Sequence, residues 1–202
     1  TEDVLIFANH STGYKSAGYN SGGGTPSLST FDANGGLIST RRLFNRETVK
    51  NYELGLKSSW LDRALKFNAT LYRMDIAGFQ DRAFDGVSFI VRNAGNLRQQ
   101  GVELDLTMAP DRNFSVTSSF AYLDSKFTNF ANASNLPGLP GTQNLTGKPN
   151  TFSPKWSGNV AVDWTHDIGS SGMNVALNGN VSFISDQFVG TVNDANPQSL
   201  AD

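Results

Sequence analysis

The feature that most constrains this chain is a strict two-residue alternation of apolar and polar side chains that recurs in long segments. In residues 51–60, for example, Tyr52, Leu54 and Leu56 alternate with Glu53 and Lys57, among others. Alternation with period two puts successive side chains on opposite faces of a β-strand, and no segment shows helical periodicity. We therefore predict an all-β fold, an antiparallel meander of about seven long strands. The segments are residues 4–10, 51–60, 65–71, 101–108, 114–122, 156–164 and 173–183.

Short and long connections alternate between these segments. Short polar turns at 61–64, 109–113 and 169–172 close three hairpins, whereas the segments 11–50, 80–96 and 126–154 are long and rich in Gly, Asn, Ser and Pro. Structureless loops of such length are uncommon in compact soluble domains. Tight turns at one end and long loops at the other are typical of outer-membrane barrels. The connections therefore favour a piece of a large transmembrane β-barrel.

The hairpins also predict a register. Residues that pair across an antiparallel hairpin lie on the same face of the sheet, so apolar side chains should meet apolar ones. A slip of one residue would destroy every such match. The predicted pairs nearest the three turns are Trp60 with Leu65, Met108 with Phe114, and Trp164 with Met173.

Strand length and aromatic spacing point to a membrane as well. We expect the strands to be long, ~10–15 residues, whereas strands of soluble proteins average ~5–6 residues. Tyr52 and Trp60 are eight residues apart, as are Trp156 and Trp164. At ~3.3 Å per residue and ~40° of tilt, eight residues climb roughly 20 Å, close to the ~25 Å apolar band between aromatic girdles. We interpret these aromatic residues as girdle positions; the alternative is that aromatic residues simply favour strands.

Composition excludes several classes of protein. The net charge is −2, and no basic stripe is present, which argues against a nucleic-acid partner. The chain has no Cys, so a disulfide scaffold, a thiolate zinc site and a cysteine nucleophile are excluded. No apolar run approaches the ~18 residues of a transmembrane helix.

Catalytic and metal chemistry find no support in the sequence. His10 and His166 are the only histidines, and neither lies near a Ser/Asp catalytic pattern. The acidic residues are scattered and do not show a metal-ligand spacing. We therefore expect neither an enzyme nor a protein with a metal site or cofactor.

Several stretches resemble segments of TonB-dependent outer-membrane receptors. They are residues 13–20 (GYKSAGYN), 44–58 (FNRETVKNYELGLKS), 71–80 (LYRMDIAGFQ), 93–95 (NAG) and 101–105 (GVELD). Their order and spacing carry the resemblance, which spans roughly residues 5–186. One departure is that Asn45-Arg46 stands where the family pattern has a proline before the glutamate.

The resemblance implies a receptor in the bacterial outer membrane that imports a scarce nutrient, with a ferric siderophore as the default cargo and cobalamin or an oligosaccharide as alternatives. Its implied partners are the membrane lipid, the receptor's own plug domain, an inner-membrane TonB-type energy-coupling protein and the small-molecule ligand. We expect residues 1–202 to be a fragment of the C-terminal half of the barrel, with the plug and other strands outside it. The rivals are a secreted soluble β-sandwich that binds carbohydrate and a passive porin.

Two groups of residues are candidate functional positions. Charged residues on the polar strand face should line the lumen and contact the plug, although a solvated face with screened ion pairs is the alternative. Aromatic and basic residues of the long loops could stack on or pair with a bulky anionic ligand, or merely pack the loops. The lumen candidates are Glu53, Lys57, Lys66, Glu103 and Asp105, and the ligand candidates are Tyr14, Tyr19, Arg41, Arg42, Phe127 and Phe130.

Overall fold

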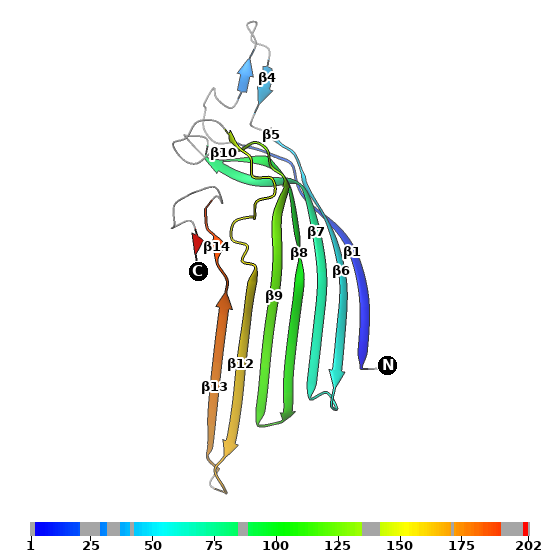
Figure 1. Ribbon diagram of the computed structural model, residues 1–202, viewed down its shortest axis with the longest axis vertical. Coiled ribbons are helices and arrows are strands. Elements are labelled where there is room, and N and C mark those ends of the chain that lie inside the picture. The colour runs from blue at the N-terminus through cyan, green and yellow to red at the C-terminus, as the bar shows by residue number, and fades with distance from the viewer. Residues whose placement is uncertain are drawn as a thin grey trace.

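The fold is a single curved wall of seven long antiparallel strands (Figure 1). The computed structural model describes residues 3–20, 29–31, 37–40, 43–84, 89–134, 142–170, 172–190 and 200–201. Each long strand pairs with the next long strand in the sequence, so the predicted meander is confirmed. The strands, in the order of the sheet, are β1 (Val4–Lys15), β6 (Glu47–Trp60), β7 (Leu65–Phe84), β8 (Phe89–Asp111), β9 (Phe114–Asn129), β12 (Trp156–Asp167) and β13 (Asn174–Ile184).

Among the described residues, eight short strands form four two-stranded ladders, three within the long connections and one in the segment that follows β13. They lie toward one end of the wall, opposite the tight turns (Figure 1). None of the described residues forms a helix long and apolar enough to cross a membrane. The paired short strands are β2 (Gly18–Tyr19) with β5 (Leu43–Phe44), β3 (Ser29–Phe31) with β4 (Leu37–Thr40), β10 (Ala133–Ser134) with β11 (Thr142–Gln143), and β14 (Gln187–Phe188) with β15 (Leu200–Ala201).

One face of the wall is apolar and uncovered. Register places Leu54, Leu71 and Val102 side by side on this face, and the same parity continues through β9, β12 and β13. Many of its large side chains, such as Leu177 and Val181, are exposed to the surroundings. A soluble sandwich would pack this face against a second sheet, so the sandwich interpretation is wrong. The apolar face is the one a barrel turns to lipid.

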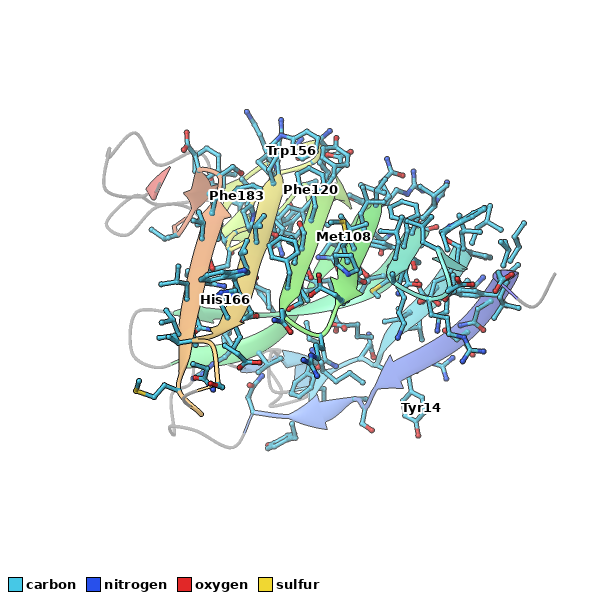
Figure 2. The ribbon with its side chains drawn as sticks, turned by 90° about the horizontal axis from the view of Figure 1, so that it is seen from below. Tyr14, Met108, Phe120, Trp156, His166 and Phe183 are labelled. Carbon is cyan, nitrogen blue, oxygen red and sulfur yellow. The ribbon has the colours of Figure 1, made fainter. Side chains whose placement is uncertain are left out.

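Aromatic side chains mark both ends of this apolar face. At the loop end, Trp156 lies over β12 (Figure 2), and its ring centroid is 4.4 Å from that of Tyr122. Phe120 and Phe183 pack beside it, one row nearer the middle of the apolar face. Near the tight turns, the Trp164 ring stacks on His166 at 5.5 Å. All these residues share the apolar parity, as the girdle interpretation requires.

The predicted register is right in one hairpin and displaced in two. Trp60 pairs with Leu65, as predicted. Met108, however, pairs with Val116 rather than with Phe114, and Trp164 pairs with Leu177 rather than with Met173. The displacements are two and four residues, and an even displacement keeps every side chain on its face. The face assignment therefore survives although the partners differ.

Turn chemistry causes both displacements. The Asp111 carboxylate accepts hydrogen bonds from the backbone N–H groups of Asn113, at 2.7 Å, and Phe114, at 3.0 Å, which closes the turn beyond Met108 and leaves a bulge. In the third hairpin, β12 continues to Asp167. There the Ile168 N–H donates to the Met173 carbonyl at 2.8 Å. The connection beyond this hydrogen bond is therefore residues 169–172, whereas a Trp164–Met173 pair would have left residues 165–172 between the strands.

The segment 80–96, expected to be a long connection in which residues 87–92 extend a hairpin, mostly extends the β7–β8 hairpin. The ladder continues through irregularities around Gly78 to the pair Phe84 with Phe89. Gly78 has φ of 66°, and a Cβ at Gly95 (φ 138°) would collide with the Asn129 carbonyl oxygen, so both bends require glycine. We call the part of this hairpin beyond Gly78 and Gly95 the β7–β8 arm.

The buried core lies at the loop end of the wall, beneath this arm. It joins side chains of β7, β8 and β9 to the segment that follows β9, and Val49, Met74 and Phe79 pack against it. It packs the described part of the segment after β9 onto the sheet. Its buried members are Ile76, Ala94, Leu97, Phe127, Phe130, Ala133 and Leu145.

Candidate functional site

The polar face of the wall gathers the five lumen candidates on three adjacent strands. Glu53 and Lys57 belong to β6, Lys66 to β7, and Glu103 and Asp105 to β8. Lys57 and Asp105 lie in one row of paired residues, with Asn68 between them, and Lys66 lies in the next row. The structure therefore brings the predicted lumen residues together.

These charges are largely free of one another. Glu53 accepts hydrogen bonds from the side-chain amides of Asn51, at 2.6 Å, and Asn9, at 3.3 Å. The Lys57 ammonium lies 5.7 Å from the centre of the Phe7 ring. The Asp105 carboxylate accepts a hydrogen bond from the Ser119 hydroxyl at 2.9 Å. Among the residues that the structure describes, none of the five lumen candidates forms an ion pair, and four are exposed.

The same face continues over β12 and β13 as a polar surface whose only acidic side chains among the described residues of these strands are Asp163 and Asp167. The Asn159 amide donates to the Ser182 hydroxyl at 2.9 Å, and the Asn178 amide donates to the Asp163 carboxylate. These cross-strand pairs leave the surface rich in amide and hydroxyl groups. Such a wall suits contact with water or with another polar surface.

Glu47 is a key position that the sequence reasoning did not single out. It is 6% exposed, accepts a hydrogen bond from the Gln80 N–H at 2.7 Å, and lies 3.4 Å from the Lys15 ammonium. The Gln80 side chain in turn donates to the carbonyls of Ser16, at 2.9 Å, and Asn45, at 3.0 Å. Glu47 thus ties the start of the β7–β8 arm to β1 and β6. The sequence feature that could have pointed to Glu47 is its place in the segment 44–58, which resembles the receptor family.

A second link holds the arm to the loop that follows β1. The Asn20 side chain, itself buried, donates to the Val91 carbonyl and accepts from the Val91 N–H, both at 2.8 Å. This side chain thereby satisfies both polar backbone groups of Val91, as a neighbouring strand would. Further down, the Asn93 amide donates to the carbonyls of Asn45, at 3.0 Å, and Gly78, at 2.7 Å.

The charge of the arm is partly buried. Asp81 lies beyond the Gly78 bend, outside the membrane-spanning part of β7. Burial raises the pKa of the Asp81 carboxyl above its ordinary value, although the Arg92 guanidinium, 3.8 Å away, works against that rise.

The ligand candidates are dispersed. Tyr14 is 75% exposed on β1, in the parity of the apolar face, and points away from the wall (Figure 2). Tyr19 is exposed and belongs to the β2–β5 ladder. Arg41 and Arg42 lie outside the described residues.

Phe127 and Phe130 instead belong to the loop core. They are 6% and 4% exposed, and their ring centroids lie 4.9 Å apart. Phe79 packs edge-on against Phe127 at 6.0 Å. Their positions match the packing role that the sequence left as the alternative.

No metal-binding arrangement accompanies these residues. Within the described ranges, no group of three or more His, Cys, Asp or Glu side chains is close enough to hold a metal ion.

Comparison with known proteins identifies the family. Residues 1–201 match the family model for the β-barrel of TonB-dependent receptor-like proteins. The chain belongs to this family. Family members are receptors of the outer membrane rather than enzymes, which confirms the predicted location and the absence of an enzymatic role.

Individual relatives agree with this assignment. The chain is 27% identical over 128 residues to a probable TonB-dependent siderophore receptor, PiuA, of Acinetobacter baumannii, a match that covers 63% of this chain and 16% of that protein. The crystal structure of the ferric yersiniabactin uptake receptor FyuA from Yersinia pestis superposes with a TM-score of 0.66 and 19% identity, over 99% of this chain and 26% of FyuA. The crystal structure of PiuA gives a TM-score of 0.65 at 18% identity, over 93% of this chain and 25% of PiuA. This family member therefore spans about a quarter or less of the length of these relatives.

Proposed function

We propose that residues 1–202 form part of the barrel wall of an outer-membrane receptor that imports a ferric siderophore. The single observation that carries the proposal is the division of one seven-stranded sheet into an uncovered apolar face and a charged polar face, in a chain of this family. Relatives named as siderophore receptors supply the class of cargo.

The polar face supports a contact with a plug domain. Lys57, Lys66, Glu103 and Asp105 are exposed and outside any ion pair among the described residues, so they are available to a partner of mixed charge inside the barrel. The plug itself would come from another part of the receptor, as would the segment that meets the inner-membrane TonB-type protein.

Ligand capture falls to the loop end in this proposal. Tyr19, Arg41 and Arg42 are the candidates for direct contact, because they belong to the long connection after β1. Phe127 and Phe130 would act by holding the loop core in place. The position of Tyr14 on the outer face favours the membrane boundary over the ligand.

The proposal is tested by iron uptake into cells that carry the full-length receptor as their sole iron-chelate transporter. Radioactive iron is offered as defined catecholate, hydroxamate and phenolate chelates, with and without an uncoupler of the inner-membrane proton gradient. We expect uptake of at least one chelate, and its loss with the uncoupler. Uptake that persists with the uncoupler would indicate a passive porin, and no uptake of any chelate would refute siderophore transport.

The plug contact has its own test. The double variant Lys57→Glu/Lys66→Glu should loosen the plug and make cells sensitive to large hydrophilic antibiotics that the outer membrane normally excludes. Arg63→Glu/Arg112→Glu makes the same change of charge in the tight turns and should leave the permeability unchanged. Equal permeability of the two variants would contradict a plug contact at Lys57 and Lys66.

A further inference from the structure

A group of basic residues lies on the apolar parity of the wall, just beyond the apolar band at the loop end. Lys50, Asp75, Arg98 and Lys126 form one continuous row of paired residues across β6, β7, β8 and β9. Arg73 lies in the next row toward the band, beside Tyr52 and Gln100. We call Lys50, Arg73, Arg98 and Lys126 the outer basic belt.

The belt lies at the height of the lipid headgroups. The row of Arg98 is two residues beyond the row of Tyr52, the girdle residue of β6. At ~3.3 Å per residue and ~40° of tilt, two residues place it about 5 Å above that girdle. The headgroup layer adds about 5–8 Å on each side of the hydrocarbon core. The belt therefore faces headgroups, because its parity is that of the lipid side.

Two guanidinium groups are held side by side within the belt. The Asp75 carboxylate binds the Nε of Arg98 through one oxygen, at 2.7 Å, and the Nε of Arg73 through the other, at 3.0 Å. The side chains of Arg73 and Arg98 are 48% and 39% exposed. Since Asp75 is bound through Nε, further N–H donors of both fork-shaped groups are left for a second anion.

The next pair along the row brings two cations together. Arg98 and Lys126 are direct cross-strand partners, and like charges directly opposite each other destabilise a sheet. Asp124 binds the Lys126 ammonium at 2.8 Å, yet the Lys126 side chain stays half exposed. A depression of about 350 Å³ opens at this pair, and Thr128, Thr146 and Gly147 also line it.

Backbone hydrogen bonds hold the side of this depression in place. The segment after β11 clamps the upper end of β9, with Gly147 N–H donating to the Phe127 carbonyl at 2.8 Å and Phe127 N–H donating to the Lys148 carbonyl at 3.0 Å. Phe127 is anchored in the loop core. Thr146, whose hydroxyl accepts a hydrogen bond from the Phe130 N–H at 2.9 Å, and Thr128 line the depression beside the two cations.

We propose that the outer basic belt binds a phosphate group of a lipid headgroup in the outer leaflet. The belt carries four positive charges against the two negative charges of Asp75 and Asp124, which leaves a net charge of +2. A phosphate monoester carries a charge of about −1.5 to −2 at pH 7, and arginine binds phosphate through two parallel hydrogen bonds. Arg98 and Lys126 would hold the phosphate in the depression, and Arg73 would contact it from the side of the band.

The opposite end of the wall lacks this arrangement. The charged residues of the tight turns and adjoining strand ends are Asp62, Arg63, Asp111, Arg112 and Asp167, with a net charge of −1. The belt therefore distinguishes the loop end from the turn end, which fits a lipid present in one leaflet only. This inference concerns the outer face and is independent of the proposed cargo.

The test measures lipid binding to the full-length receptor by native mass spectrometry in detergent. The probes are diphosphoryl lipid A, phosphatidylethanolamine and inorganic phosphate as a competitor. We expect lipid A to bind in preference to phosphatidylethanolamine, and the double variant Arg98→Gln/Lys126→Gln to bind lipid A about tenfold more weakly. The matched control, Arg63→Gln/Arg112→Gln, and the charge-conserving Lys126→Arg should bind lipid A as the unmodified receptor does.

Three outcomes would overturn the proposal. Unchanged lipid A binding by the double variant would show that the belt is not the site. Displacement of lipid A by an equal concentration of inorganic phosphate would indicate a site for free phosphate. Equal binding of phosphatidylethanolamine would remove the selectivity for a phosphate monoester. Heat-modifiable gel migration checks that each variant is folded. If the double variant is not folded, the single variant Arg98→Gln replaces it and should also bind lipid A more weakly than the unmodified receptor, and unchanged binding would overturn the proposal.

Discussion

Placing an arginine in the middle of the apolar band tests the assignment of the two faces most directly. Leu104 lies in the row formed with Leu56, Ala69 and Phe120. This row is four residues from that of Gln100 at the loop end and four from that of Met108 at the turn end. At ~3.3 Å per residue and ~40° of tilt, Leu104 is about 10 Å from either boundary, close to the bilayer midplane.

The expected cost of Leu104→Arg follows from that depth. An arginine on the lipid face of a barrel costs about 2–4 kcal/mol at the midplane and about 0–1 kcal/mol near an interface. The folded state of Leu104→Arg should therefore be disfavoured by about 30- to 700-fold. Gln100→Arg, on the same face at the boundary, should change stability by at most about 1 kcal/mol.

A matched variant on the other face completes the test. Thr70 pairs directly with Glu103 on the polar face, one residue away from the midplane row. Thr70→Arg should be neutral or slightly stabilising, because opposite charges across a strand pair contribute roughly 0.2–1 kcal/mol.

The assay is urea-induced unfolding of the full-length receptor in phospholipid vesicles, followed by tryptophan fluorescence. If Thr70→Arg destabilises the receptor as much as Leu104→Arg, the two faces are assigned wrongly. If Gln100→Arg costs as much as Leu104→Arg, the apolar face is not in contact with a bilayer.

Three further perturbations test the loop end and the close strand contacts. Glu47→Ala leaves the Gln80 N–H without its buried acceptor, which costs about 1–3 kcal/mol. Amide exchange in the β7–β8 arm should therefore accelerate by about 5- to 150-fold. Unchanged exchange would show that Glu47 does not hold the arm. Gly101→Ala places a Cβ against the Tyr122 carbonyl oxygen and should lower the thermal midpoint of the full-length receptor; an unaltered midpoint would contradict this close approach. Because the folded-state pKa of Asp81 is raised, the folded arm binds the proton more tightly than the unfolded arm. The stability of the folded arm should therefore rise as the pH falls through that pKa, which slows amide exchange after correction for the intrinsic rate. Asp81→Asn should abolish this pH dependence. An Asp81→Asn variant with the same pH profile as the unmodified receptor would refute the role of Asp81.

The strand faces were predictable because they depend only on local periodicity. In residues 51–60 and 101–108, the alternation of apolar and polar side chains assigns the two faces of the sheet, and the observed register confirms this assignment. The exact cross-strand pairing partners were harder to predict from the sequence. Asp111 ends its hairpin by capping two backbone N–H groups, a choice that alternation alone does not specify.

The candidate site divides in the same way. The lumen candidates, such as Lys57 and Asp105, follow from face parity, and the structure places them on one face of the sheet. Phe127 and Phe130 were ambiguous, because an aromatic residue in a polar loop can either bind or pack. Glu47 and the outer basic belt were not predictable, since Gln80, the partner of Glu47, and Asp75, the partner of Arg98, lie tens of residues away in the sequence.

The sequence by itself determined which side chains share a face, that the strands form hairpins in order, and which end carries the long loops. These properties depend on residues that are near neighbours, through the pleat of the strand and the composition of the turns. The tertiary structure decided the register of two hairpins, the extension of β7 and β8 into an arm, and the burial of Phe127 and Phe130. It also set Arg98 opposite Lys126. Each of these depends on hydrogen bonds and packing between distant segments, whose relative positions exist only once the sheet has formed.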